Sequence, residues 1–269
     1  MQINNIILKN RFFLGTANYP SMQIMQDAIQ AAGVEVITVS LSRARFGIED
    51  NRFFNLLSQL KCNVLPNTAG CYSAVDAVNT AKLAREVFQT NWIKLEVITD
   101  DYTLHPHSLE LLKATEILIK EGFTVFPYCT DDLLICQELV NRGCQILMPM
   151  ASPIGSGQGL LNQYGLRLLR EKFADIYLII DAGIGCPSHA AQAMEIGFDA
   201  VLLNSAVSQA VDPITMAKSF NLAVEAGRSA YLAGIMPKRN FATTSTQYFN
   251  RPFFAKSIND ENRLDNSCK

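Results

Sequence analysis

The stretch WIKLEVI, residues 92–98, decides the fold of this chain. Successive side chains of a β-strand point to opposite faces, so Lys94 and Glu96 share one face while the apolar residues beside them share the other. Helices that cover a parallel sheet bury its apolar face. The face that carries Lys94 and Glu96 is then left to point inward, and an inward face exists where the sheet closes into a barrel.

The rest of the chain repeats one unit, a short β-rich run followed by a helical pattern. Eight runs are expected to form strands: 11–16, 34–41, 63–69, 92–98, 124–129, 145–151, 176–182 and 200–206. The helical pattern is clearest in residues 73–88, where small apolar residues recur at spacings of three and four. Ser73 is expected to cap this helix, with Asp76 in the capping-box position.

Strands that alternate with helices predict a parallel sheet, and eight such units predict a closed (β/α)8 TIM barrel in a single α/β domain. An open, doubly wound sheet is the alternative. It would carry a GxGxxG turn after the first strand, and GTANYPS, residues 15–21, does not match that pattern. We place the barrel at residues 1–239 and expect the polar tail, residues 240–269, to be disordered.

The composition limits the partners and the location that we expect. The formal net charge of −2 argues against the basic face of a nucleic-acid-binding protein. The longest apolar runs are far shorter than the roughly 20 residues of a membrane span, and the first residues lack the pattern of a signal peptide. The seven cysteines form no CxxC pair. We therefore expect free thiols in a reducing cytoplasm rather than disulfides or a zinc site.

Three charged residues are the first candidates for catalysis, because catalytic groups of such barrels lie at the C-terminal ends of the strands. An inward Lys94 would be partly desolvated, which is expected to lower the pKa of its amine and favour the neutral nucleophile of a Schiff base. Asp181 ends a bulky apolar run, so it is expected at the barrel mouth as a general acid or base. The alternatives are a structural ion pair between Lys94 and Glu96, and an Asp181 that caps a helix or loop.

Two neighbouring turns favour a phosphate site. Gly183 and Gly185 follow Asp181, lack side chains and lead into a helix, so their backbone amides could approach an anion closely. We expect this turn to lie at the surface. Asn204 and Ser205 end the eighth strand in the matching place. The loops after the seventh and eighth strands hold phosphate in many barrels of this class.

The loop after the sixth strand, residues 152–159, carries three glycines at alternate positions. This spacing predicts a lid or an anion-binding rim, and an ordinary flexible loop is the alternative. Asn67 and Thr68 end the third strand and are expected to line the mouth. Both segments would lie on the same face of the barrel as the charged residues.

Two other features are weaker candidates. Cys71 could be a nucleophile, but no base partner is assigned to it, so a structural role is the simpler interpretation. His105 and His107 lie near two aspartates and hint at a metal site. They lack a third close ligand, so we interpret the segment as a solvated loop.

Several long strings of the chain resemble thiazole synthase of bacterial thiamine biosynthesis. The strings are PNTAGC (66–71), NWIKLEV (91–97), PYCTDD (127–132), SPIGSGQGLLN (152–162), DAGIG (181–185) and NSAVSQAVDPITMAKSFNLAVEAGR (204–228). The resemblance runs from about residue 11 to residue 239 and passes through every strand–helix unit in order.

The resemblance implies a phosphosugar-binding (β/α)8 barrel. Such an enzyme condenses 1-deoxy-D-xylulose 5-phosphate with dehydroglycine and with sulfur from the C-terminal thiocarboxylate of a ubiquitin-like carrier protein. By resemblance, Lys94 forms the imine with the sugar ketone, and Glu96 and Asp181 are its partner carboxylates. The positions matched to the sugar-phosphate contacts are Gly155, Ala182, Gly183, Asn204 and Ser205. A homo-oligomer, tetrameric in the family, and a separate enzyme that supplies dehydroglycine are also implied, whereas no metal or cofactor is.

The chain departs from the family pattern at the rim. Asn18 stands where the family has a lysine, Ser42 falls in a segment that tends to read ALRR, and Thr99 and Ala151 replace usual glycines. These changes concern the docking of the carrier and leave the residues of the core chemistry in place. Two other functions remain open, a class I aldolase-type Schiff-base enzyme and a non-catalytic phosphosugar-binding barrel, since an inward lysine beside phosphate turns fits either.

Overall fold

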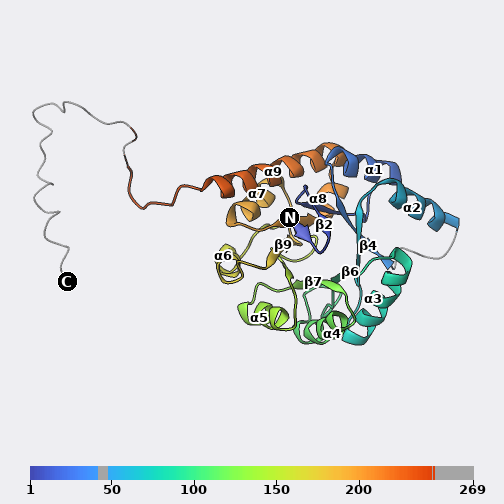
Figure 1. The fold of residues 1–269 in the computed structure, drawn as a ribbon. Helices are drawn as coiled ribbons and strands as arrows, with labels where there is room; N and C mark the ends of the chain where they lie inside the picture. The colour runs from blue at the N-terminus through green and yellow to red at the C-terminus, as the bar shows by residue number, and fades with distance from the viewer. Residues whose placement is uncertain (42–47, 244, 246–269) are drawn as a thin grey trace, which may run out of the picture. The chain divides into compact units, whose positions relative to one another are not determined.

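The computed structural model describes residues 1–41, 48–243 and 245 of the chain. Its centre is a closed barrel of parallel strands in the order β10-β3-β4-β5-β6-β7-β8-β9 (Figure 1). The strands are β3 (Phe12–Gly15), β4 (Val36–Ser40), β5 (Asn63–Asn67), β6 (Trp92–Leu95), β7 (Thr124–Cys129), β8 (Ile146–Pro149), β9 (Tyr177–Asp181) and β10 (Ala200–Leu203). All eight predicted strands are present, and the prediction of a (β/α)8 barrel is confirmed.

Helices surround the ring of strands (Figure 1). They are α1 (Met22–Ala31), α2 (Ile48–Gln59), α3 (Ala74–Phe88), α4 (Ser108–Lys120), α5 (Leu133–Asn141), α6 (Gln163–Lys172), α7 (Pro187–Ile196), α8 (Ser205–Ser208) and α9 (Pro213–Ala233). The predicted cap of α3 is confirmed, because the Ser73 hydroxyl accepts a hydrogen bond of 3.1 Å from the amide of Asp76. The prediction that the last strand reaches residue 206 was wrong, since the short helix α8 begins at Ser205.

Two apolar clusters show which way the strands face. One cluster lies inside the barrel and includes Phe13, Trp92 and Phe126. The other fills the space between strands and helices and includes Ile93 and Leu95. Because Trp92 and Ile93 fall in different clusters, the alternation predicted for this strand is confirmed. The even-numbered residues of β6, which share a face with Trp92, therefore point into the barrel.

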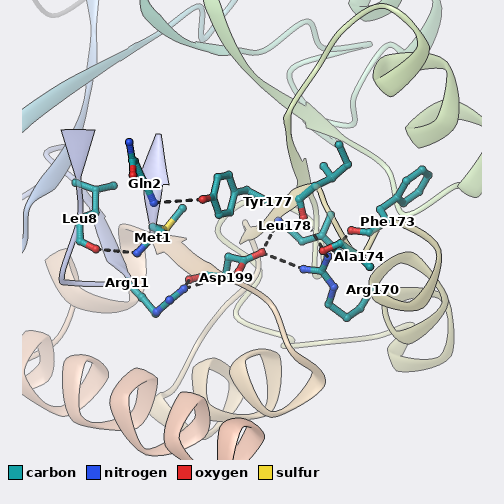
Figure 2. Close-up of polar contacts among 11 residues, drawn as sticks. Met1, Gln2, Leu8, Arg11, Arg170, Phe173, Ala174, Tyr177, Leu178 and Asp199 are labelled. Carbon is teal, nitrogen blue, oxygen red and sulfur yellow. Dashed lines mark hydrogen bonds and ion pairs between the residues drawn. The ribbon is translucent and has the colours of Figure 1, made fainter. Parts of the chain in front are cut away.

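An N-terminal hairpin closes one end of the barrel, and nothing in the sequence analysis had assigned it. Strands β1 (Gln2–Ile3) and β2 (Ile6–Ile7) pair antiparallel, and Ile3 and Leu8 are buried in the interior cluster. The amine of Met1 donates a hydrogen bond of 2.9 Å to the carbonyl of Leu8, and Figure 2 shows this contact. The interior of a barrel is a packed core. The side chains of Ile3 and Leu8 fill this core at the end where the strands begin.

A polar network around Asp199 joins several elements at this same end of the barrel (Figure 2). The Asp199 carboxylate accepts from Arg170 and from the amide of Leu178, both at 3.0 Å. Arg11 donates to the carbonyl of Asp199 at 2.7 Å, and the amide of Gln2 donates to the Tyr177 hydroxyl at 3.3 Å. These groups bond to one another and to the backbone, so we assign this end of the barrel to stability rather than chemistry.

The chain divides into two units, Met1–Ile235 and Met236–Lys269. The boundary that we predicted after residue 239 and the disorder predicted for residues 240–269 stay predictions. Residues 244 and 246–269 of that tail lie outside the described residues. In the part of the chain that the structure describes, no helix is long and apolar enough to span a membrane.

Candidate active site

A cavity of about 490 Å³ opens at the C-terminal ends of the strands. Its wall contains the eight residues to which the resemblance gave a catalytic or phosphate-binding role: Lys94, Glu96, Gly155, Asp181, Ala182, Gly183, Asn204 and Ser205. The barrel brings them together from the ends of β6, β8, β9 and β10, which are far apart in the sequence. The roles assigned to these residues stay predictions.

Lys94 lies between two carboxylates on the inner wall. Its Nζ atom is 2.6 Å from Oδ2 of Asp181 and 3.2 Å from Oε1 of Glu96. The side chain of Lys94 is only 7% exposed, that of Asp181 3% and that of Glu96 8%. The amide of Ala182 also donates to Oδ1 of Asp181 at 2.8 Å, which fixes the orientation of that carboxylate. A buried lysine in contact with two buried carboxylates at the wall of a cavity is typical of a catalytic site.

The expectation of a lowered lysine pKa was wrong for the unliganded protein. Burial by itself lowers the pKa of Lys94, but attraction to the carboxylates of Asp181 and Glu96 outweighs burial and leaves that pKa raised. The sequence showed that the lysine was buried but could not show that Asp181, from β9, reaches it. The resting amine is therefore an ammonium, and it must lose a proton before it can act as a nucleophile.

The pKa of Glu96 shifts in the direction that suits proton transfer. Burial raises this pKa, the positive charge of Lys94 opposes the rise, and the negative charge of Asp181 adds to it. A carboxyl group whose pKa is raised can accept and return a proton nearer to neutral pH than an exposed glutamate can. Glu96 is therefore suited to general acid–base work beside Lys94.

Two residues near the lysine differ from the expectations. Asn67 lines the cavity as predicted, but Thr68 is fully buried, and its hydroxyl contacts the backbone of Glu96. Tyr128 was not considered at all. It is fully buried on β7, and its ring centroid lies 5.6 Å from Nζ of Lys94. The available signal was its spacing of two from Phe126, which places both side chains on the inner face of one strand.

The glycine turn after β9 is buried, so the expectation that it lies at the surface was wrong. Ala182 and Gly183 both have positive φ values, 61° and 69°. The Gly183 carbonyl accepts from the amide of Gly159 at 2.8 Å and from the Ser152 hydroxyl at 3.2 Å. A side chain at Gly183 would collide with Ser152. The turn is therefore packed tightly under the loop that follows β8.

The glycine-rich loop after β8 is held against the same turn. Gly155 and Gly157 line the cavity and have φ values of 73° and 66°. A Cβ added to Gly185 would collide with the backbone of Gly157. The amide of Gly185 donates to Nδ1 of His189 at 3.2 Å. Since both segments present glycine backbone to the cavity, this side can hold an anionic group on amides.

Asn204 and Ser205 complete the wall at the end of β10. The Nδ2 atom of Asn204 donates to the carbonyl of Ala17 at 3.0 Å, which ties this residue to the loop after β3. A Cβ added to Gly15 would lie 2.6 Å from Cβ of Asn204. Glycine at position 15 is therefore what lets the two strand ends approach each other.

The weaker candidates, Cys71, His105 and His107, do not line the cavity. Cys71 is buried, its Sγ atom lies 3.5 Å from the Thr80 hydroxyl, and burial raises the pKa of its thiol. His107 caps α4, where Nδ1 accepts from the amide of Glu110 at 3.5 Å. Nδ1 of His105 lies 3.3 Å from the carbonyl of Pro106. The expectation of free thiols is confirmed for the six cysteines that the structure describes.

Four positions at the rim of the barrel differ from the family pattern, and their surroundings differ from one another. Asn18 lines the cavity with a φ of 62°, a conformation that asparagine adopts more readily than most residues. The Thr99 hydroxyl donates to Asp100 at 3.0 Å. The amide of Ala151 donates to the carbonyl of Asp181 at 2.9 Å, as in a continuing strand. Ser42 lies outside the described residues.

Comparison with known proteins identifies the family of this chain. A family model described as "Thiazole biosynthesis protein ThiG" matches residues 2–247. Thiazole synthase of Coxiella burnetii (strain Dugway 5J108-111) is 59% identical over 93% of this chain and 97% of its own length. Thiazole synthase of Bradyrhizobium sp. (strain ORS 278) is 55% identical over 91% of this chain and 95% of its own length.

A solved structure is similar as well. A crystal structure of the Amycolatopsis orientalis BexX/CysO complex matches with a TM-score of 0.79 and 28% identity, covering 88% of this chain and 97% of that one. Fold and site thus define a (β/α)8-barrel enzyme with a buried lysine between two carboxylates at the mouth. With the family model and the curated relatives, they establish that the chain belongs to the thiazole synthase family of thiamine biosynthesis.

Proposed function

We propose that this protein makes the thiazole phosphate carboxylate from 1-deoxy-D-xylulose 5-phosphate, dehydroglycine and sulfur, through an imine at Lys94. The observation that carries this proposal is the contact of Lys94 with both Asp181 and Glu96 on the cavity wall. A lysine in this setting can form an imine with a ketone, because neighbouring carboxylates can take and return the protons.

The first step requires a neutral amine. Asp181, whose Oδ2 atom is the nearer carboxylate oxygen at 2.6 Å, is positioned to take a proton from Nζ of Lys94. The amine then adds to the sugar ketone, and loss of water gives a protonated imine. The iminium group withdraws electrons from the adjacent carbon, so a carboxylate can remove a proton from that carbon. Glu96 and Asp181 both lie within reach of Nζ and are the candidates for this second transfer.

The phosphate of the sugar would lie against the glycine turns. Gly155 and Gly183 would contribute backbone amides, and Asn204 and Ser205 would complete the site from the end of β10. The amide of Ala182 already donates to Asp181, so Ala182 would contact the sugar phosphate through its other backbone atoms. All of these residues line the same cavity as Lys94. Backbone amides at positive-φ turns can approach a phosphate without side-chain obstruction. A class I aldolase or a non-catalytic barrel is not favoured, because the family match covers nearly the whole chain.

The imine is tested by trapping with borohydride in the presence of 1-deoxy-D-xylulose 5-phosphate. Borohydride delivers hydride to the imine carbon and leaves a stable secondary amine on the lysine. Mass spectrometry of the digested protein should find the adduct on Lys94. Lys94→Arg keeps the charge but supplies no neutral amine, so it should not be trapped. Lys120→Arg, an exposed change on α4, is the matched control and should be trapped normally. An adduct at another lysine would overturn the assignment.

The sulfur source would be a thiocarboxylated, ubiquitin-like carrier protein. The occurrence of BexX in a complex with CysO supports a second protein for this barrel. The carrier terminus would pass beside the glycine-rich loop, where Gly157 has a positive φ and lines the cavity. An extended Gly-Gly terminus is thin enough to reach a buried lysine between such a loop and the barrel mouth.

Titration of the protein with the host's carrier tests this partner. Gly157→Leu should weaken binding because a bulky side chain would stand beside the terminus. Gly122→Leu is the matched control, since Gly122 also has a positive φ but precedes β7, at the opposite end of the barrel. A Cβ at Gly122 meets no atom within 4 Å, and a Cβ at Gly157 meets Gly185 only at an ordinary contact distance of 3.6 Å. Equal turnover with free sulfide and with carrier, together with no binding, would contradict the proposal. The proposed homo-oligomer, a tetramer, is checked by sedimentation of the full chain.

A further inference from the structure

The strand ladder ends beside Glu96. Strand β6 ends at Leu95, and the register between β5 and β6 pairs Asn67 with Lys94. The amide of Thr68 still donates to the carbonyl of Lys94 at 3.2 Å. Glu96 therefore follows directly after the last residue of its strand, where regular pairing no longer fixes the backbone.

One side chain takes the place of the missing pairing. The Thr68 hydroxyl accepts a hydrogen bond of 2.8 Å from the amide of Glu96 and donates one of 2.7 Å to the carbonyl of the same residue. Thr68 is fully buried, and a β-branched side chain has restricted rotamers. Both backbone groups of Glu96 are thus held by a single hydroxyl whose own position is fixed.

We propose that Thr68 is a positioning residue for Glu96, which rests on the catalytic role proposed above for that glutamate. Holding the backbone of Glu96 at both polar groups sets where its carboxylate meets Lys94, at 3.2 Å. The carboxylate of Asp181 also contacts this lysine, and two buried carboxylates repel each other. Without the anchor, Glu96 would move away from Asp181 and from the reacting nitrogen.

The test is a double-variant cycle in the full-length protein with Thr68→Val and Glu96→Gln. Valine has the shape of threonine but no hydroxyl, so the amide and carbonyl of Glu96 lose this partner. The kcat of Thr68→Val should fall by about 10- to 100-fold, because small misplacements of a catalytic group have effects of this size. KM for the sugar phosphate should change little, since Thr68 does not line the cavity.

Three further measurements separate positioning from general stability. In the Glu96→Gln background, Thr68→Val should change kcat by no more than about twofold, because the group it positions has been removed. Thr68→Ser keeps the hydroxyl and should restore most of the activity. Thr115→Val removes another fully buried threonine hydroxyl, on α4, and should leave kcat unchanged. Should Thr68→Val not fold, Thr68→Ala takes its place in the same cycle.

The outcomes distinguish this inference from the proposed function. Unchanged kcat in Thr68→Val, with activity lost in Glu96→Gln, would overturn the positioning role and leave the mechanism standing. Equal losses from Thr68→Val in both backgrounds would also overturn it, because the effect would not pass through Glu96. Full activity of Glu96→Gln would overturn the catalytic role of the glutamate and the positioning role with it.

Discussion

The Nζ atom of Lys94 lies 2.6 Å from Oδ2 of Asp181, and both side chains are almost completely buried. This ion pair keeps the amine protonated in the resting protein, so the group that stabilises the lysine is also the group that must release it. Removing water from such a pair strengthens the attraction between its charges. The site is therefore arranged to hold an ammonium until substrate enters.

Removal of the Asp181 charge should shift the pH dependence of imine formation. The raised pKa of Lys94 depends in part on Asp181, so Asp181→Asn should lower this pKa. The midpoint of cyanoborohydride trapping with pH should fall by about 1–3 units, while the maximal rate decreases because a proton acceptor is lost. Glu116→Gln, on the exposed face of α4, should shift neither quantity. A midpoint at higher pH in Asp181→Asn would contradict this account.

Removal of the Lys94 charge should destabilise the fold in a pH-dependent way. In Lys94→Met two buried carboxylates face each other, and breaking a buried ion pair in this way costs about 3–5 kcal/mol. Burial already raises the pKa of Glu96 above its ordinary value of 4.5, and the charge of Lys94 opposes this rise. Without Lys94, that pKa should rise further.

The sign of this pH dependence follows from linkage. A carboxyl group with a raised pKa in the folded state contributes stability that is present below pH 4.5 and is lost as pH rises through the raised pKa. The difference in melting temperature between the wild type and Lys94→Met should therefore be small near pH 5 and large near pH 8. Thermal unfolding at the two pH values checks this, and a pH-independent difference would contradict it.

The sequence contained enough information for the barrel and for the composition of the site. Period-two alternation placed Lys94 and Glu96 on one inner face because this rule is local. The alternation could not show that Asp181 and Lys94 are in contact, because the distance between their side chains depends on how the strands close into the barrel. The error in the direction of the lysine pKa followed from this missing distance.

Two other features were missed for related reasons. The hairpin of residues 2–7 is too short to give a periodic signal, and its burial comes from the open end of the barrel that it fills. The packing of Gly183 against Ser152 depends on two loops that are far apart in the sequence. Glycine type alone suggested backbone approach to a ligand but could not distinguish a surface turn from a buried one.

A matched pair of glycine variants should separate backbone strain from crowding. Gly155 and Gly183 both line the cavity and have similar φ values, 73° and 69°. Alanine at either position therefore costs a similar backbone strain of about 1 kcal/mol. Only at Gly183 does an added Cβ collide with Ser152, whereas Gly155 has open space. Gly183→Ala should thus be less stable than Gly155→Ala by a further 1–3 kcal/mol or so. Denaturant unfolding measures this difference in stability. Equal stabilities of the two variants would show that the loop carrying Ser152 moves to make room for the added Cβ.

The ring of Tyr128 should matter for the reaction, while its hydroxyl should not. The ring lies 5.6 Å from Nζ of Lys94, and a buried aromatic face stabilises a cation, including a protonated imine, by about 0.5–2 kcal/mol. The Tyr128 hydroxyl is buried with no hydrogen-bond partner among the described residues. Tyr128→Phe should therefore keep the trapping rate and melt no lower, whereas Tyr128→Leu should slow trapping by about 2- to 30-fold. An equal loss in both variants would assign the effect to the hydroxyl, and no loss in Tyr128→Leu would exclude the ring.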